Sequence, residues 1–100
     1  MIKTNISKDQ IKFLNLHKSF FSDLNNTSIE ITDNKVMIYD SSNQNSDPAS
    51  VELAHLNNFY IVYYWDGYSL ADRYESDDYK SAILEFKKFA KKLAKNLRKF

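Results

Sequence analysis

Two histidines are the side chains in this sequence best suited to bind a metal ion or transfer a proton near neutral pH. His17 and His55 lie far apart in the chain, no His-x-x-x-His pair occurs, and there is no cysteine. Zinc centres need several such ligands brought close together. His17 shares helical spacing with Leu14 and Phe21, so we expect it in the core or at its boundary. We therefore predict no metal site.

Nucleophilic catalysis and phosphate binding also lack their usual residues. Gly67 is the only glycine, so the chain has neither a Gly-x-Ser-x-Gly nucleophile turn nor a glycine-rich phosphate loop. Carboxylates are numerous, but no spacing marks two of them as a buried pair. We therefore expect no enzymatic activity, no catalytic residue and no cofactor.

Aromatic side chains gather in residues 58–78, which read NFYIVYYWDGYSLADRYESDD. The run FYIVYYW contains only β-branched and aromatic residues, which is typical of a strand, and Asp66-Gly67 is a strong hairpin signal. A two-residue loop at Asp66-Gly67 predicts a hairpin with a defined register. That register pairs Trp65 with Tyr68, Tyr63 with Leu70, Ile61 with Asp72 and Phe59 with Tyr74.

The predicted register divides this hairpin into two faces. One is almost wholly apolar and is the expected core face, carrying Phe59, Ile61, Tyr63 and Trp65. The other carries tyrosines and an arginine, residue types that are favoured at binding hot spots. We predict partner-binding anchors at Tyr60, Tyr64 and Arg73, with electrostatic contacts from Asp66, Asp72, Glu75, Asp77 and Asp78. The alternative is that the tyrosines only pair on a solvated face and that two carboxylates only serve the next helix.

Charge is divided unevenly along the chain. Residues 1–78 carry six Lys/Arg against twelve Asp/Glu, and residues 79–100 carry eight against one. The two parts therefore have net charges of −6 and +7, which combine to the overall +1. Such asymmetry often marks an interaction surface.

Hydrophobic spacing predicts the elements that hold these residues. A helix is expected from about Lys8 to Leu24, started by a capping box formed by Ser7 and Gln10. TSIEIT-DN-KVMIYD then predicts a hairpin around Asp33-Asn34. Its apolar residues coincide on one face when Ile29 lies opposite Ile38 and Ile31 opposite Val36.

The second half of the chain completes the expected fold. A polar loop over residues 41–50 precedes a third strand, VELAHL, and the aromatic hairpin follows. From Tyr79 the apolar spacing predicts a long helix, capped by Ser76 or Asp77. We predict one α+β domain over residues 1–100: an N-terminal helix, an antiparallel sheet of about five strands, and a long amphipathic C-terminal helix packed on the sheet.

The segment from Tyr60 onward resembles small immunity proteins of bacterial toxin–immunity systems, the contact-dependent inhibition and polymorphic toxin systems. The resemblance lies in the aromatic strand YIVYYW, the Asp-Gly turn and the return strand LADRYE. It continues with SDD before a helix that contains AILEFKKFAKKL. It covers about the last 40 residues, while the first sixty match no family that we can name.

This resemblance implies a cytoplasmic protein without catalytic activity that binds one cognate toxin protein and occludes its active site. Many toxins of this class are nucleases with basic clefts, which acidic immunity surfaces complement. This chain departs from a strongly acidic member because only its first 78 residues are acidic. The absence of cysteine fits the cytoplasm, and no apolar run approaches a signal peptide or the ~20 residues of a membrane span. We expect no membrane partner, and the sequence does not choose between monomer and homodimer.

Two alternatives use other features of the chain. The basic C-terminal helix could make the protein a small nucleic-acid-binding accessory protein, although the acidic remainder would repel phosphate. A secretion chaperone or dimeric adaptor is the other alternative, although such proteins usually interleave helices among their strands.

Overall fold

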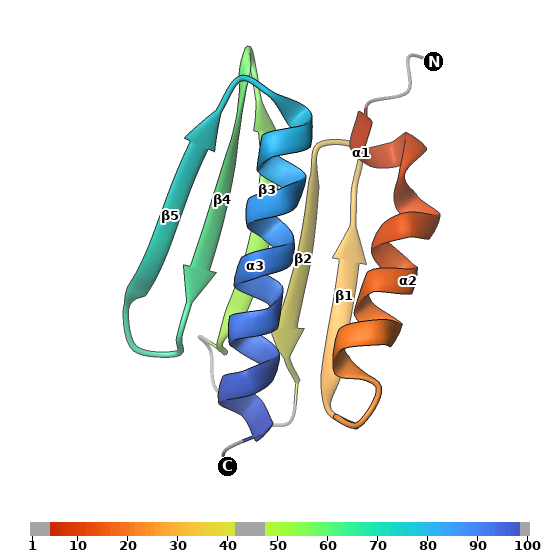
Figure 1. Ribbon diagram of the computed structural model, residues 1–100, viewed down its shortest axis with the longest axis vertical. Helices are drawn as coiled ribbons and strands as arrows, with labels where there is room; N and C mark the ends of the chain where they lie inside the picture. The colour runs from red at the N-terminus through yellow and green to blue at the C-terminus, as the bar shows by residue number, and fades with distance from the viewer. Residues whose placement is uncertain (1–4, 42–47, 99–100) are drawn as a thin grey trace.

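A computed structural model of the chain describes residues 5–41 and 48–98. These residues form a single five-stranded antiparallel sheet in which the strands follow one another in chain order, with the helices packed on one face (Figure 1). The predicted α+β class, with a long C-terminal helix on the sheet, is confirmed. The elements are α1 (Asn5–Lys8), α2 (Gln10–Phe21), β1 (Thr27–Ile31), β2 (Lys35–Asp40), β3 (Ser50–Leu56), β4 (Phe59–Trp65), β5 (Leu70–Ser76) and α3 (Tyr79–Arg98).

The N-terminal helix differs from the prediction. It starts before Lys8, is divided at Asp9 into α1 and α2, and ends at Phe21. Ser7 lies inside α1, so the predicted capping box is wrong. Tertiary contacts override the local signal, because Ile6 is fully buried in the core and the Tyr79 hydroxyl donates to an Asp9 carboxylate oxygen at 2.8 Å.

The first hairpin forms in the predicted register. Ile29 lies opposite Ile38 and Ile31 opposite Val36, and the Thr32 amide donates to the Lys35 carbonyl across the turn at 2.8 Å. Both pairs face the helices, and Val36 and Ile38 are fully buried. The predicted polar loop over residues 41–50 lies mostly outside the described residues, and β3 begins at Ser50.

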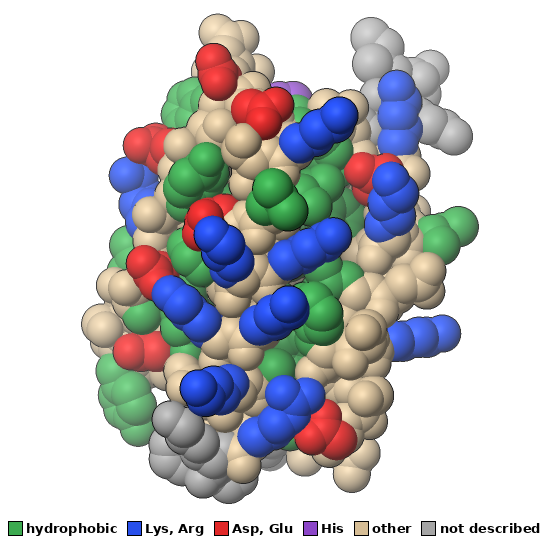
Figure 2. All heavy atoms as spheres, in the orientation of Figure 1, with side chains coloured by type: hydrophobic (Ala, Val, Ile, Leu, Met, Phe, Trp, Pro, Cys, Tyr) green, Lys and Arg blue, Asp and Glu red, His purple; other side chains and the backbone are tan. Residues whose placement is uncertain are grey.

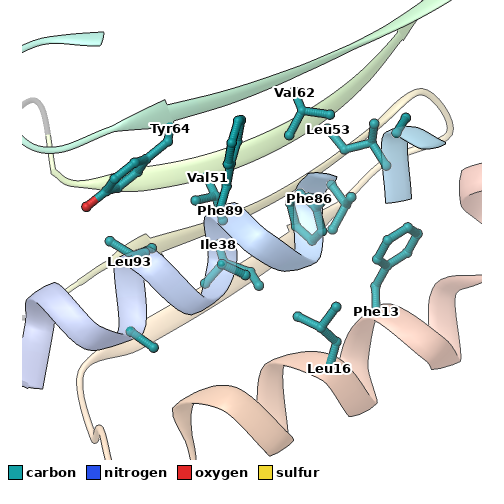
Figure 3. Close-up of a cluster of buried hydrophobic side chains, with 14 of the residues drawn as sticks. Phe13, Leu16, Ile38, Val51, Leu53, Val62, Tyr64, Phe86, Phe89 and Leu93 are labelled. Carbon is teal, nitrogen blue, oxygen red and sulfur yellow. The ribbon is translucent and has the colours of Figure 1, made fainter. Parts of the chain in front are cut away.

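The core lies between the sheet, α3 and α2 (Figure 3). The apolar stripe of α3 supplies Phe86, Phe89 and Leu93, and β2, β3 and β4 supply the opposing layer. Phe13 of α2 meets the edge of the Phe86 ring, with ring centroids 5.8 Å apart and ring planes at 90°. This contact joins both helices to the same cluster.

The second hairpin forms in a different register from the one predicted. Trp65 lies opposite Leu70 and Tyr64 opposite Asp72, with a bulge between these two pairs. The connection spans Asp66–Ser69 rather than two residues, because an Asp66 side-chain oxygen accepts the amides of Tyr68 and Ser69, each at 2.8 Å. Gly67 in this turn has a φ of 101°, which glycine adopts without strain.

This shift changes which residues of β5 share each face of β4. Because the net displacement is an odd number of residues and strand side chains alternate between faces, Arg73 lies on the face of Tyr63 rather than on that of Tyr60. Tyr60, Val62 and Tyr64 form the side of β4 that packs against the helices, and they are buried. Phe59, Tyr63 and Trp65 lie on the opposite face, so their assignment to the core beneath the helices is wrong.

The start of α3 is capped one residue later than predicted. Asp78, rather than Ser76 or Asp77, accepts the Ser81 amide at 3.0 Å and the Ser81 hydroxyl at 2.6 Å. The Ser76 hydroxyl oxygen instead accepts the Asp78 amide at 2.9 Å. These bonds from Ser81 hold the pKa of Asp78 below its ordinary value of 3.8.

Asp78→Ala is expected to lower the melting temperature by about 5 °C at pH 7, because the first turn of α3 loses its cap. A lowered pKa in the folded state stabilises the protein above pH 3.8, and this contribution is lost as the pH falls through the folded pKa. The difference between wild type and variant should therefore shrink towards pH 3. Asp77→Ala is the matched control, since it removes the same charge from an exposed neighbour. If thermal melts showed the same fall in melting temperature for both variants, Asp78 would not be the cap of α3.

The long C-terminal helix presents its polar side to solvent. Figure 2 shows Lys and Arg side chains gathered along α3 on the helix side of the molecule. Among the described residues, no helix is both long and apolar enough to cross a membrane.

Candidate partner-binding surface

Tyr60 and Tyr64 are core residues that anchor the first and last elements of the chain. Tyr60 is 6% exposed, stacks on His55 with ring centroids 4.4 Å apart, and accepts a hydrogen bond from the Asn5 side chain at 3.0 Å. Tyr64 is 4% exposed and its hydroxyl accepts a hydrogen bond from Asn96. Burial raises the pKa of Tyr64. The prediction that these tyrosines lie on an exposed face is wrong, because their side of β4 is the side that packs against the helices.

His17 lies at the edge of the core, as its spacing predicted. Its ring is tilted against Phe21, with centroids 5.5 Å apart, and its Nε2 atom hydrogen-bonds the Thr27 hydroxyl at 3.0 Å. Partial burial lowers the pKa of His17. These contacts give the histidine a packing role between α2 and β1.

Most of the predicted acidic contacts have partners inside the chain. Asp72 accepts from Lys92 of α3 at 2.6 Å, and Glu75 pairs with Arg73 at 3.1 Å. Asp66 organises the turn and Asp78 caps α3. The carboxylates of Asp72 and Glu75 each lie beside a cation. The two residues therefore add little net negative charge to the surface that a partner would meet.

The predicted site residues do not share one surface. Asp72 lies on the helix side of β5, whereas Arg73 and Glu75 lie on the opposite side. Asp66 stands at one end of β5, and Asp77 and Asp78 follow its other end. Of the predicted anchors, Arg73 remains exposed, and it lies on the same face of the sheet as the aromatic set Tyr39, Tyr63 and Trp65.

That set belongs to the face of the sheet that none of the described helices covers. We call it the open sheet face. The pairing register arranges it in rows across neighbouring strands, and the Lys35–Glu52 and Arg73–Glu75 ion pairs, at 3.9 and 3.1 Å, lie among the aromatic residues. The rows are Glu30–Met37–Glu52–Tyr63–Arg73, Ser28–Tyr39–Ser50–Trp65–Leu70 and Lys35–Ala54–Ile61–Glu75.

The most exposed aromatic side chain among the described residues is in the turn between β4 and β5. Tyr68 is 93% exposed, and Leu70, opposite Trp65, is 48% exposed. The Tyr68 amide is fixed by Asp66, and the amide bonds from Ser69 and Tyr68 lower the pKa of that carboxyl group. A turn closed by these two hydrogen bonds therefore presents a large side chain to solvent. We call Trp65, Tyr68, Leu70 and Arg73 the hairpin surface.

Sequence reasoning missed Tyr68 and Leu70 because a two-residue loop places them inside the sheet. The available signal was the pair Asp66 and Ser69. Aspartate at the first position of a turn accepts amides two and three residues later and favours a longer connection. A four-residue loop built in this way moves Tyr68 from the strand to the tip.

A small hollow between α2 and α3 offers little to a ligand. Its volume is about 200 Å³, and Ser19, Phe20, Lys91, Ala94 and Arg98 line it. Small-molecule pockets usually measure ~300–1,000 Å³. Arg98 is also held by both carboxylate oxygens of Asp23, each at 2.8 Å.

The hairpin surface is thus the strongest candidate for binding another molecule. It combines an exposed tyrosine, an exposed leucine and a tryptophan with a flanking arginine. Comparison with known proteins adds no family, since no protein-family model, no curated protein and no solved structure matches this chain.

Proposed function

We propose that this chain is an immunity protein that binds one cognate bacterial toxin domain in the cytoplasm and neutralises it by covering its active site. The observation that carries the proposal is the near-complete exposure of Tyr68 on a turn fixed by Asp66. Tyrosine and arginine are the residue types that dominate binding hot spots, and a leucine beside them extends the apolar contact. A preorganised turn reduces the entropy that binding must overcome.

In this proposal the anchors move from the buried tyrosines to the hairpin surface. Tyr68 and Leu70 would enter a recess on the toxin, and Trp65 would extend the contact along the open sheet face. Arg73 and Glu75 would lie at the rim, where charged pairs set orientation more than affinity. Inhibition by occlusion requires no catalytic group, so the immunity protein itself needs no enzymatic activity.

The basic side of α3 supports a second candidate, binding to nucleic acid through phosphate contacts. Figure 2 shows Lys and Arg side chains gathered along α3. The described cations of this helix are Lys80, Lys87, Lys88, Lys91, Lys92, Lys95 and Arg98. Several are partly neutralised, since Lys88 pairs with Glu85 at 3.7 Å, Lys92 with Asp72 and Arg98 with Asp23. Lys91 also lies over the Phe20 ring. This neutralisation favours the first proposal.

The proposal predicts a gene for a large secreted protein immediately upstream of the gene that encodes this chain, and the absence of such a gene would count against it. The C-terminal domain of that protein is then expressed in a bacterial host, alone and together with this chain. We expect growth to stop with the domain alone and to resume with the chain, and calorimetry to give a dissociation constant of about 10 nM or lower. Failure to restore growth, with both proteins folded and abundant, would refute the proposal. A titration with generic duplex DNA at low salt tests the second candidate in the same preparation.

A further inference from the structure

Strand β5 is an outer edge of the sheet. It pairs with β4 on one side only, and Figure 1 shows no helix or strand beyond it. An edge strand carries backbone N–H and C=O groups that can pair with another strand. The side chains of β5 determine which strand can pair with this edge.

We propose that two copies of this chain pair β5 with β5 in antiparallel orientation, joining their two five-stranded sheets into one continuous sheet. With Tyr74 of both copies on the twofold axis, Arg73 of each copy lies opposite Glu75 of the other. Both residues are on the open sheet face, where each side chain already reaches 3.1 Å from its neighbour in the same strand. Dimerisation would place two arginines and two glutamates in one alternating cluster.

The charges of Arg73 and Glu75 favour this pairing register over the registers shifted by one or two residues. A shift by two residues in one direction places Arg73 opposite Arg73, and a shift in the other direction places Glu75 opposite Glu75. Like charges directly opposite each other destabilise a strand pair. A shift by one residue places the helices of the two copies on opposite sides of the joined sheet and no longer sets Arg73 opposite Glu75.

The helix side of β5 is compatible with the same pairing. Tyr74 packs partly buried at the margin of the core, so its exposed part would contact Tyr74 of the second copy. Lys92 is the α3 cation bound to β5, through Asp72 at 2.6 Å. Because this pair neutralises Lys92, it reduces the repulsion between the two basic helices across the axis.

The dimer is a separate proposal from toxin binding, although Arg73 and Glu75 belong to both proposed contacts. In the proposed register Tyr68 lies beyond the last paired residue, so each hairpin tip would remain accessible at an opposite end of the interface. Failure of dimerisation would leave the proposed immunity function untouched, and failure to bind a toxin would leave the dimer untouched.

The test is the mass in solution, measured by light scattering and sedimentation equilibrium at about 0.1 mM protein, where a dissociation constant in the micromolar range gives mostly dimer. We expect twice the chain mass of 11.8 kDa. R73E and E75R should each raise the dissociation constant at least about tenfold, because symmetry places two like-charge pairs in every dimer. The double variant R73E/E75R restores opposite charges and should dimerise again.

The matched control is K35E, which reverses a charge of the Lys35–Glu52 pair on the same face but away from β5. K35E should retain the dimer mass. The proposal is overturned if the wild type has a mass of 11.8 kDa at this concentration. It is also overturned if R73E or E75R keeps the wild-type dissociation constant, or if a folded R73E/E75R remains monomeric.

Discussion

Phe86→Ala is expected to lower the free energy of unfolding by about 3–5 kcal/mol. Phe86 is fully buried and lies where α3 meets both the sheet and α2, as Figure 3 shows. Its ring also receives the edge contact from Phe13. Alanine would leave a cavity bounded by three elements, and none of them can close it without losing its own contacts.

Chemical denaturation measures this loss, with fluorescence of the only tryptophan, Trp65, as the signal. Leu84→Ala is the control, because Leu84 belongs to the same helix and is exposed. We expect that control to change stability by no more than about 0.5 kcal/mol. If Phe86→Ala cost less than about 1 kcal/mol, Phe86 would not be the central contact of the core.

Tyr68→Ala is expected to weaken toxin binding about 30-fold while leaving stability nearly unchanged, since truncating a binding hot spot costs about 2 kcal/mol. The side chain is 93% exposed, so removing it leaves no cavity in the free protein. The turn itself depends on the Tyr68 backbone amide, which alanine retains. A loss of affinity can therefore be attributed to the missing side chain.

Ile11→Ala is the matched control for this measurement. Ile11 is another exposed apolar residue, but it lies on α2, away from the hairpin surface. Calorimetric titration with the toxin should show a loss of affinity for Tyr68→Ala and none for Ile11→Ala. Equal affinities for wild type and Tyr68→Ala would place the toxin contact elsewhere on the chain.

The two hairpins explain what the sequence could predict. In the first, apolar and polar residues alternate, so Ile29 and Ile31 can face Ile38 and Val36 in one register only. In the second, every residue of β4 is apolar or aromatic, and no alternation marks a buried side. The predicted choice of the buried side therefore rested on the β5 residues beside each face, which follow from the length of the turn. The Asp66 side chain lengthens that turn and moves Arg73 to the face that was expected to be apolar.

The residues of the candidate site were predicted only in part. Arg73 was predicted in a partner-binding role and is exposed, because its position on an edge strand leaves it at the surface. Tyr60 and Tyr64 were expected at the surface and are buried. The division of the N-terminal helix at Asp9 could not be predicted from local sequence either. It depends on Tyr79, which is seventy positions away in the chain.

The contact between Tyr79 and the N-terminal helix also constrains the order of folding. The Tyr79 hydroxyl oxygen lies 3.0 Å from the Asn5 carbonyl oxygen, 74 positions away in the sequence, and Ile6 is buried in the cluster that α3 completes. During synthesis the sheet can be assembled once Ser76 has left the ribosome, but its apolar face stays uncovered until α3 follows. The uncovered apolar face exposes the nascent chain to aggregation in that interval, and α1 gains its contact with Tyr79 only when α3 forms.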